Sequence, residues 1–488
     1  MVSDEEMREG NILNLFWKFT FPTVIGVLIA GIQGIIDGFF IGNAVGSEGL
    51  AGITLAYPPY LVIIGVGIVI GIGASTLVAL ELGKGNKKGA LGIVHNAFPL
   101  SLLAGAIFTI AGLIFCEKFI GVLGTNGPSL NFARDYLEVI FLGSVFMILT
   151  VALEPLVRND GKPKLCTKIM VAGIIANILL DYLFVMHLKM GMSGAALATV
   201  ISFAVPALLF TYYLSGKEAK IRLQLKAMRL EINTIFEFLK AGLPSFMMQL
   251  SFAFVLFVHN YMLLKYGSEL AVSAYGIIGY VFSIFYMLFE GIALGVQPII
   301  GFNYGAGHYG RVSKTLKLTM LSCILIGALG FSLIYIFPEQ VVQIFSQNDS
   351  ELLQTTLHGM NFIGLSLLVE GIVLLASIYY QSINRVKAAL FINLGKVFVF
   401  LLPLLFILPV FFGLDGVWAA GPATEYVMLG VVLAMLSKEF QFLKTGKVKT
   451  EKANEVIKIR PEKVDAKENS RLISVRNIKE AKPHKQLP

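Results

Sequence analysis

Long apolar segments alternate with short polar connections along the whole chain. Twelve of these segments reach the roughly 20 residues that a helix needs to cross the hydrocarbon core of a bilayer. They are continuous apolar runs, unlike the short alternating segments of a transmembrane β-barrel. The predicted spans are 16–41, 51–80, 90–115, 132–157, 165–186, 192–214, 236–264, 270–302, 312–337, 352–380, 388–411 and 417–436. The pattern predicts an all-α integral membrane protein with twelve transmembrane helices.

The two halves of the chain repeat each other at an offset of 222 positions. Three motif pairs carry the repeat: Lys18 and Pro22 with Lys240 and Pro244, Gly83 and Gly85 with Gly305 and Gly307, and Gly191 and Gly194 with Gly413 and Gly416. Six helices per copy give both copies the same membrane orientation, so we expect two lobes related by a pseudo-twofold axis along the membrane normal. The predicted parts are an N-lobe (1–215), a cytoplasmic linker (216–235), a C-lobe (236–437) and a basic, disordered cytoplasmic tail (438–488).

Composition agrees with this class and explains the net charge. Apolar residues make up 56% of the 488 positions and charged residues only 14%, well below the share in a soluble domain. Three isolated cysteines indicate neither disulfides nor a metal site. The net charge of +8 lies mostly in the tail, where 14 Lys and Arg face 7 Asp and Glu. The partners that this distribution favours are the lipid bilayer and its anionic headgroups, not nucleic acid.

Basic residues in the connections predict the orientation. The connections after predicted helices 2, 4, 6, 8 and 10 hold 18 Lys and Arg, Arg158 among them, whereas the opposite connections hold four. Positive charge marks the cytoplasmic side. We therefore expect both termini in the cytoplasm.

Polar residues inside the apolar spans are the candidate functional residues, because each is costly in lipid and marks an ion or substrate path. Asp37 lies near the outer end of helix 1, and Asn177 and Asp181 share one face of helix 5. Together with Thr199 of helix 6 they lie roughly 6 to 14 Å from the outer helix ends. Oxygen ligands suit a hard cation such as Na⁺, and two buried carboxylates also hold a proton. Packing hydrogen bonds are the alternative interpretation.

The second half breaks this symmetry. His259 occupies the repeat position of Asp37, while Glu290, Glu370, Lys396 and Glu425 lie within helices 8, 10, 11 and 12. Pairing of Glu290 or Glu370 with Lys396 is one structural interpretation. Flexible and flat side chains are suited to contact varied ligands. We accordingly group the following as a predicted substrate-contacting or secondary polar network: Gln33, Met147, His259, Glu290, Glu370 and Lys396.

Three segments resemble the multidrug and toxic-compound extrusion (MATE) family. They are Gln297–Val312 (QPIIGFNYGAGHYGRV), Glu154–Lys164 (EPLVRNDGKPK) and Gly191–Ser202 (GMSGAALATVIS). The resemblance extends over residues 10–440 and is greatest to the damage-inducible and archaeal subgroup. It implies a prokaryotic plasma membrane protein that exports cationic or amphipathic drugs against inward flow of H⁺ or Na⁺. No cofactor and no enzymatic activity are implied, and we expect a monomer.

The resemblance also implies roles for individual residues. The N-lobe cation site of that subgroup corresponds here to Asp37, Asn177, Asp181 and Thr199, and its helix 1 hinge corresponds to Pro22. A proline inside a helix independently predicts a kink. The other large subgroup uses an acid on helix 7, where this chain has His259.

Two other functions remain as alternatives at this point. A flippase for lipid-linked saccharide precursors shares the architecture, but it predicts a strongly basic cavity, whereas Lys396 stands nearly alone among carboxylates. A membrane prenyl or acyl transferase requires aspartate-rich metal motifs or a histidine pair, and the sequence shows neither.

Overall fold

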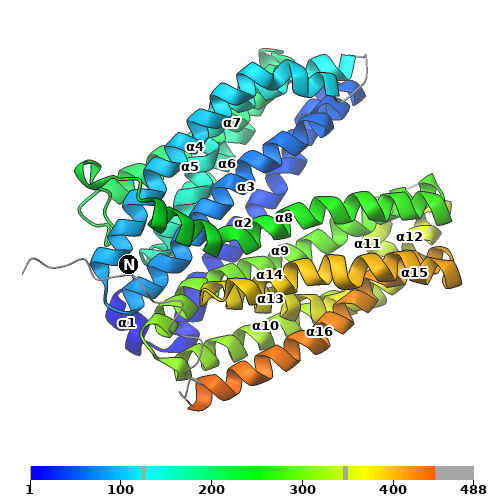
Figure 1. Cartoon of the computed structure of the whole chain (residues 1–488). Coiled ribbons are helices and arrows are strands. Elements are labelled where there is room, and N and C mark those ends of the chain that lie inside the picture. Colours follow the sequence, from blue (N-terminus) through cyan, green and yellow to red (C-terminus); the bar gives the residue numbers. More distant parts are fainter. Residues whose placement is uncertain (1, 123–127, 344–349, 446–488) are drawn as a thin grey trace, which may run out of the picture. The chain divides into compact units, whose positions relative to one another are not determined.

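A computed structural model describes residues 2–122, 128–343 and 350–445, and this part of the chain is helical almost throughout (Figure 1). The α-helices are α1 (Asp4–Glu9), α2 (Ile12–Ala44), α3 (Ser47–Gly83), α4 (Lys87–Val122), α5 (Pro128–Asn159), α6 (Pro163–Asp181), α7 (Gly191–Ser215), α8 (Ile232–Tyr266), α9 (Glu269–Gly305), α10 (Tyr309–Ile336), α11 (Pro338–Gln343), α12 (Ser350–Ile363), α13 (Leu367–Ser382), α14 (Val386–Leu394), α15 (Leu402–Phe412) and α16 (Leu414–Thr445). Two π-helical turns, η1 (Tyr182–His187) and η4 (Gly395–Leu401), and two 3₁₀ turns, η2 (Leu225–Ala227) and η3 (Gly364–Ser366), complete the order.

The described chain contains 12 helical stretches that are long and apolar enough to cross a membrane, so the predicted number of spans is confirmed. Several spans are less regular than predicted. The π-turns widen the fifth and eleventh spans, and the tenth consists of α12, η3 and α13. The linker holds only the 3₁₀ turn η2 before α8 begins at Ile232. Helix α16 continues to Thr445, past the predicted start of the tail, and residues 446–488 lie outside the described residues.

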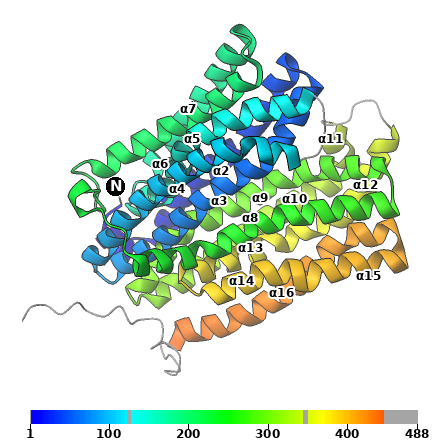
Figure 2. The same ribbon diagram turned by 45° about the horizontal axis from the view of Figure 1, so that its top comes forward.

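The helices between residues 2 and 444 pack as two lobes. Figures 1 and 2 show α2–α7 side by side as one group and α8–α16 as a second group. Each group encloses its own apolar core; Leu137 and Phe210 are fully buried in the first, and Phe289 and Trp418 in the second. The predicted two-lobe architecture is therefore confirmed.

The lobes meet through backbone contacts that follow the sequence repeat. Helix α3 packs against α8 and α9, and α2 packs against α9. A Cβ on Gly83 of α3 would overlap the carbonyl oxygen of Phe302, and a Cβ on Gly305 of α9 would overlap that of Leu80. Position 83 corresponds to 305 and position 80 to 302 at the 222-residue offset, so one contact is the image of the other. Only glycine permits helices to approach this closely.

We call the end of the lobes that carries the turns at 84–86, 160–162, 306–308 and 383–385 the basic end. There, the short helix α1 bonds to both lobes. Arg8 donates from Nη2 to the Gly83 carbonyl (3.0 Å) and lies 5.7 Å from the centre of the Phe302 ring. Arg311 of α10 donates to the carbonyls of Met7 (3.1 Å) and Gly10 (2.8 Å). The α1 helix thus ties the N-lobe to the C-lobe.

The linker is fixed at the same end by Asp160. Its carboxylate accepts hydrogen bonds from the Tyr213 hydroxyl and from the Ile221 backbone N–H (3.0 Å). Burial raises the pKa of the Asp160 carboxyl above its ordinary value, although these two hydrogen bonds act in the opposite direction. The linker is therefore a packed part of the N-lobe and not a free tether.

Candidate functional site

The structure brings the predicted N-lobe acids together between α2 and α6. The carboxyl groups of Asp37 and Asp181 face each other, and the Asn177 amide lies against both. Asn177 and Asp181 are fully buried. Among the described residues, one oxygen of Asp37, both oxygens of Asp181 and both polar atoms of Asn177 are buried without a well-formed hydrogen bond. Two facing carboxylates away from water require a proton or a cation between them, because neither charge is solvated.

Local helix geometry explains how the two α6 side chains reach one point. Asn177 and Asp181 are one turn apart, so they project from the same face. Directly after Asp181 the α-helix gives way to the π-turn η1, whose wider turn spreads the backbone. Such π-turns inside helices occur frequently at functional sites.

Thr199 and Gln33 lie at the edge of this cluster. The Thr199 hydroxyl donates to the Ala195 carbonyl (3.0 Å) in its own helix, which leaves its oxygen available as an acceptor. Gln33 donates from Nε2 to the Ser202 hydroxyl (3.2 Å), and Ser202 in turn donates to the Thr199 carbonyl (2.6 Å). Gln33 therefore joins α2 to α7.

Two tyrosines that sequence reasoning missed complete the surroundings of the cluster. Tyr60 of α3 and Tyr136 of α5 lie within electrostatic range of Asp37, and Tyr136 also lies near Thr199. Tyr136 is only 5% exposed. A tyrosine deep in an apolar span is a signal for a buried polar site, because its hydroxyl needs a partner.

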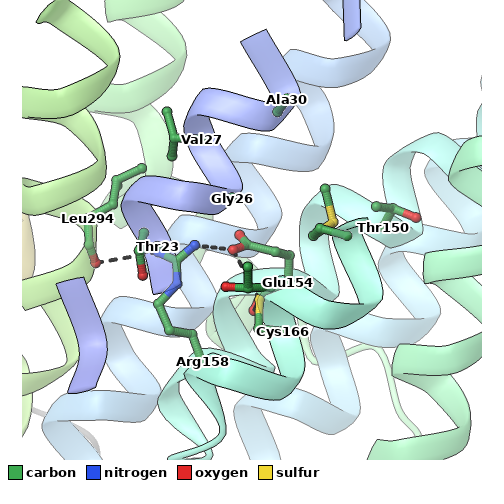
Figure 3. A pocket seen from close by; sticks show the side chains of 11 residues that line it. Thr23, Gly26, Val27, Ala30, Thr150, Glu154, Arg158, Cys166 and Leu294 are labelled. Carbon is green, nitrogen blue, oxygen red and sulfur yellow. Dashed lines mark hydrogen bonds and ion pairs between the residues drawn. The ribbon is translucent and has the colours of Figure 1, made fainter. Parts of the chain in front are cut away.

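A pocket of about 150 Å³ opens between α2, α5, α6 and α9 (Figure 3). It contains an ion pair between the buried Arg158 and the partly exposed Glu154, one turn apart in α5. Arg158 also donates from Nη1 to the Leu294 carbonyl of the C-lobe (3.4 Å), and Cys166 donates to Glu154 (3.3 Å). The predicted spans place Arg158 in the cytoplasmic connection after the fourth span. That placement was wrong: Arg158 lies in α5 and is 4% exposed.

Both repeat-related prolines have a side-chain partner on the fifth or eleventh span. The Pro22 carbonyl accepts a hydrogen bond from the Thr167 hydroxyl of α6 (2.7 Å). The Pro244 carbonyl accepts one from Nδ2 of Asn393 in α14 (2.9 Å). These bonds fasten each lobe's first helix at its proline, which is where a helix bends most easily.

The C-lobe charges pair differently from the sequence expectation. Lys396 forms an ion pair with Glu425 of α16, not with Glu290 or Glu370. Glu370 lies within electrostatic range of both members of the pair, and Glu290 lies within range of Arg158. Tyr286 lies within electrostatic range of Glu290, Glu370 and Glu425, so the C-lobe acids lie around one tyrosine.

The remaining two predicted residues are packed. The His259 ring stacks on Tyr275, with ring centres 5.1 Å apart and planes 2° from parallel. Met147 is completely buried in the N-lobe core, where it contacts other apolar side chains. Its contact with substrate stays a prediction.

Twelve membrane-spanning helices in two repeat-related lobes, with buried carboxylates inside each lobe, define a membrane transporter. The MatE family model matches residues 22–183 and 244–407, which together make up more than half of the chain. The two matched segments begin at positions related by the 222-residue offset. The chain belongs to the MatE family.

Curated relatives and solved structures agree with this assignment. The multidrug export protein MepA of Staphylococcus haemolyticus is 29% identical over 419 residues, covering 85% of this chain and 92% of the relative. MepA of Staphylococcus aureus is 27% identical over 436 residues, covering 88% and 96%. A structure described as the outward-facing conformation of a multidrug resistance MATE family transporter of the MOP superfamily has a TM-score of 0.85 at 22% identity, covering 91% of this chain and 99% of the other. These relatives are transporters and not enzymes, and they do not favour the flippase alternative.

Proposed function

We propose that this protein is a secondary active antiporter that exports cationic or amphipathic small molecules in exchange for H⁺ or Na⁺ by alternating access. Similarity to the multidrug export protein MepA over most of both chains supports the substrate class. The observation that carries the coupling role is the buried cluster of Asp37, Asn177 and Asp181, whose polar atoms lack well-formed hydrogen bonds within the described chain.

The proposed coupling site consists of Asp37, Asn177 and Asp181, with the Thr199 oxygen at its edge. Carboxylate, amide and hydroxyl oxygens are the donors that hard cations prefer, and a carboxylate pair in an apolar place equally accepts a proton. This N-lobe arrangement supports placement in the damage-inducible and archaeal subgroup. The site residues therefore fit either coupling ion.

The end at which the lobes are closed indicates to which side of the membrane the lobes open. The lobes are joined at the basic end by α1 and by the contacts of Gly83 and Gly305. Lys and Arg concentrate on the cytoplasmic side of membrane proteins. We therefore assign the basic end and both termini to the cytoplasm of a prokaryotic plasma membrane, which makes this state outward-facing. We propose that the protein works as a monomer.

In the proposed cycle the ion and the substrate favour different states, since a ligand shifts an equilibrium only by its differential affinity. A proton or sodium ion arriving from outside binds Asp37 and Asp181 and favours release of the substrate. Bending of α2 at Pro22 follows from neutralising Asp37, because the charge no longer holds the outer half of the helix against α6. The lobes then open at the basic end for the next substrate.

The test is substrate-driven ion flux in proteoliposomes, with separate H⁺ and Na⁺ gradients. We expect Asp37→Asn and Asp181→Asn to abolish ion-driven efflux of a cationic dye while expression and folding stay normal. Asp135→Asn is the matched control, because Asp135 is an exposed carboxylate near the start of α5. Wild-type efflux by Asp37→Asn would refute the coupling site. The gradient that drives the wild-type protein identifies the ion.

A further inference from the structure

The C-lobe contains a second buried charge cluster, which the proposed coupling step does not use. Lys396 of η4 pairs with one carboxylate oxygen of Glu425 in α16. Glu425 is 6% exposed, and within the described chain its other oxygen has no hydrogen-bond partner. Glu370 of α13 lies within electrostatic range of both. One ammonium therefore faces two carboxylates, and the cluster has an excess of negative charge.

Aromatic side chains border this cluster. Tyr286 of α9 lies within electrostatic range of Glu370 and Glu425, and Tyr275 lies within range of Glu370. Tyr275 is itself the middle of an aromatic group, stacked on His259 and 6.2 Å from the Trp418 ring centre. Carboxylates beside aromatic faces are the surroundings that bind organic cations, because ring faces attract positive charge without hydrating it.

The cluster suits an extended organic cation. The positive charge at this place is an alkylammonium, that of Lys396. A lipophilic organic cation has the same charge and spreads it over a similar apolar body.

The Lys396 side chain can move away from Glu425. It begins in the π-turn η4, whose wider turn loosens the local packing. Its side chain is 28% exposed, whereas that of Glu425 is 7% exposed. Lysine has four rotatable bonds in its stem and carries its charge to a more solvated place when a competitor arrives.

We propose that Lys396 is a tethered competitor for substrate: a monovalent organic cation binds beside Glu425 and Glu370, against Tyr275 and Tyr286, and displaces the Lys396 ammonium. This inference rests on the proposed export of organic cations and adds a C-lobe subsite to it. The resident ammonium pairs with Glu425 when the subsite is empty, so Glu425 has a cationic partner at every stage of the cycle.

Binding of tetraphenylphosphonium to the full-length protein tests the proposal, with neutral triphenylphosphine oxide as the uncharged comparison. We expect Lys396→Met to bind tetraphenylphosphonium at least about fivefold more tightly than wild type, which is the low end of ordinary coupling between linked events. Glu425→Gln should bind it more weakly by a similar factor, and Lys396→Arg should stay near wild type. None of these variants should change binding of the neutral compound. Lys265→Met is the control, because Lys265 is exposed at the end of α8.

A second measurement uses the wild-type chain and does not depend on a variant folding. Lys396 is labelled with an amine-reactive acylating reagent and quantified by mass spectrometry. Saturating tetraphenylphosphonium should raise labelling of Lys396 at least about fivefold and leave Lys265 unchanged. Equal affinity in wild type and Lys396→Met, or labelling of Lys396 that does not rise, would overturn the inference.

The two proposals fail in different ways. Wild-type protein that neither binds nor exports tetraphenylphosphonium would contradict the proposed substrate class and this subsite with it. Wild-type protein that exports tetraphenylphosphonium under an ion gradient, with unchanged affinity in Lys396→Met, would contradict the tethered competitor alone.

Discussion

The two lobes share a backbone plan but neutralise their buried carboxylates differently. In the N-lobe, Asp37 and Asp181 face each other with the Asn177 amide beside them, and no ammonium or guanidinium of the described residues contacts either. In the C-lobe, Glu425 and Glu370 have Lys396 beside them. A carboxylate cluster without a resident cation depends on the solution for one, whereas a cluster with its own lysine does not. The comparison therefore distinguishes an acidic site without a resident cation from an acidic site that a lysine of the same lobe partly neutralises.

What the lobes have in common is the packing of their backbones. The contact of Gly83 with Phe302 repeats as the contact of Gly305 with Leu80. The carbonyls of Pro22 and Pro244 each accept a hydrogen bond from a polar side chain of the same lobe. The two six-helix units thus share backbone contacts, while the charged residues inside them differ.

The largest expected effect on transport comes from giving the N-lobe the resident cation that the C-lobe has. Asn177→Lys places an ammonium beside Asp37 and Asp181. We expect ion-driven dye efflux in proteoliposomes to fall by about a hundredfold, equivalent to about 2.7 kcal/mol, because the tethered charge competes with the coupling ion. Asn177→Leu is the comparison, since it removes the amide without adding charge. If efflux by Asn177→Lys still depends on the outside H⁺ or Na⁺ concentration, the proposed difference between the two acidic clusters is wrong.

A variant of the pair of Arg158 and Glu154 tests whether the N-lobe tolerates an unpaired charge outside the cluster of Asp37 and Asp181. Removing one partner of a buried pair leaves the other charge uncompensated and costs about 3–5 kcal/mol. Because the Glu154 side chain is 23% exposed, we expect Arg158→Met to lose stability at or below the low end of this range, read from thermal unfolding in detergent. Arg134→Met is the control, because the pair of Arg134 with Glu117 is largely exposed and is worth about 1 kcal/mol or less. Equal stability of the two variants would contradict the assignment of Arg158 to the interior.

Valine at either lobe-contact glycine tests the shared backbone plan. Gly83→Val and Gly305→Val each drive a side chain into a facing carbonyl, at a cost of about 1–3 kcal/mol. We expect both to shift the lobes apart at the basic end by a similar amount. Distances between spin labels at the exposed positions Lys88 and Lys314 measure that separation. Gly310→Ala is the control, because a Cβ there meets no other atom within 4 Å. A large shift in only one of the two valine variants would refute the equivalence.

The smallest expected effects come from the bonds that fasten the prolines. Thr167→Val removes the hydrogen bond to the Pro22 carbonyl, and Asn393→Leu removes the one to Pro244. Each loss costs about 1 kcal/mol, the usual net value of such a bond. We expect Thr167→Val to change the efflux rate, since α2 carries Asp37, and Asn393→Leu to change only the unfolding temperature. If Thr167→Val and Asn393→Leu change efflux equally, the helix that contains Pro244 also bends during transport.

Much of the fold follows from the sequence because apolar length and internal repetition are strong signals. Twelve spans and two lobes were predicted from these signals and are confirmed. The π-turn after Asp181 and the one that contains Lys396 were not predicted, since their extra residue leaves the apolar pattern unchanged. Helix α1 was missed because six residues are too few to show periodicity.

The polar sites were predictable only in part. The grouping of Asp37, Asn177 and Asp181 could be predicted because polar side chains at the same depth in adjacent spans have few other polar partners. Their roles in coupling stay predictions. The pairing of Lys396 with Glu425 depends on how α16 is rotated, and a helix that is apolar on nearly all sides does not encode its rotation. For the same reason Tyr60 and Tyr136 could not be assigned to the site in advance.

The position of α1 offers a way to follow the lobes without any label. Its bonds run to Gly83 on one lobe and from Arg311 on the other, so α1 releases one set when the lobes part at the basic end. Trypsin cuts after arginine, and the bond after Arg8 lies in this short helix. The rate at which trypsin removes the first eight residues therefore measures how often the lobes separate at the basic end. We expect slow cleavage in the closed state and faster cleavage under any condition that separates the lobes.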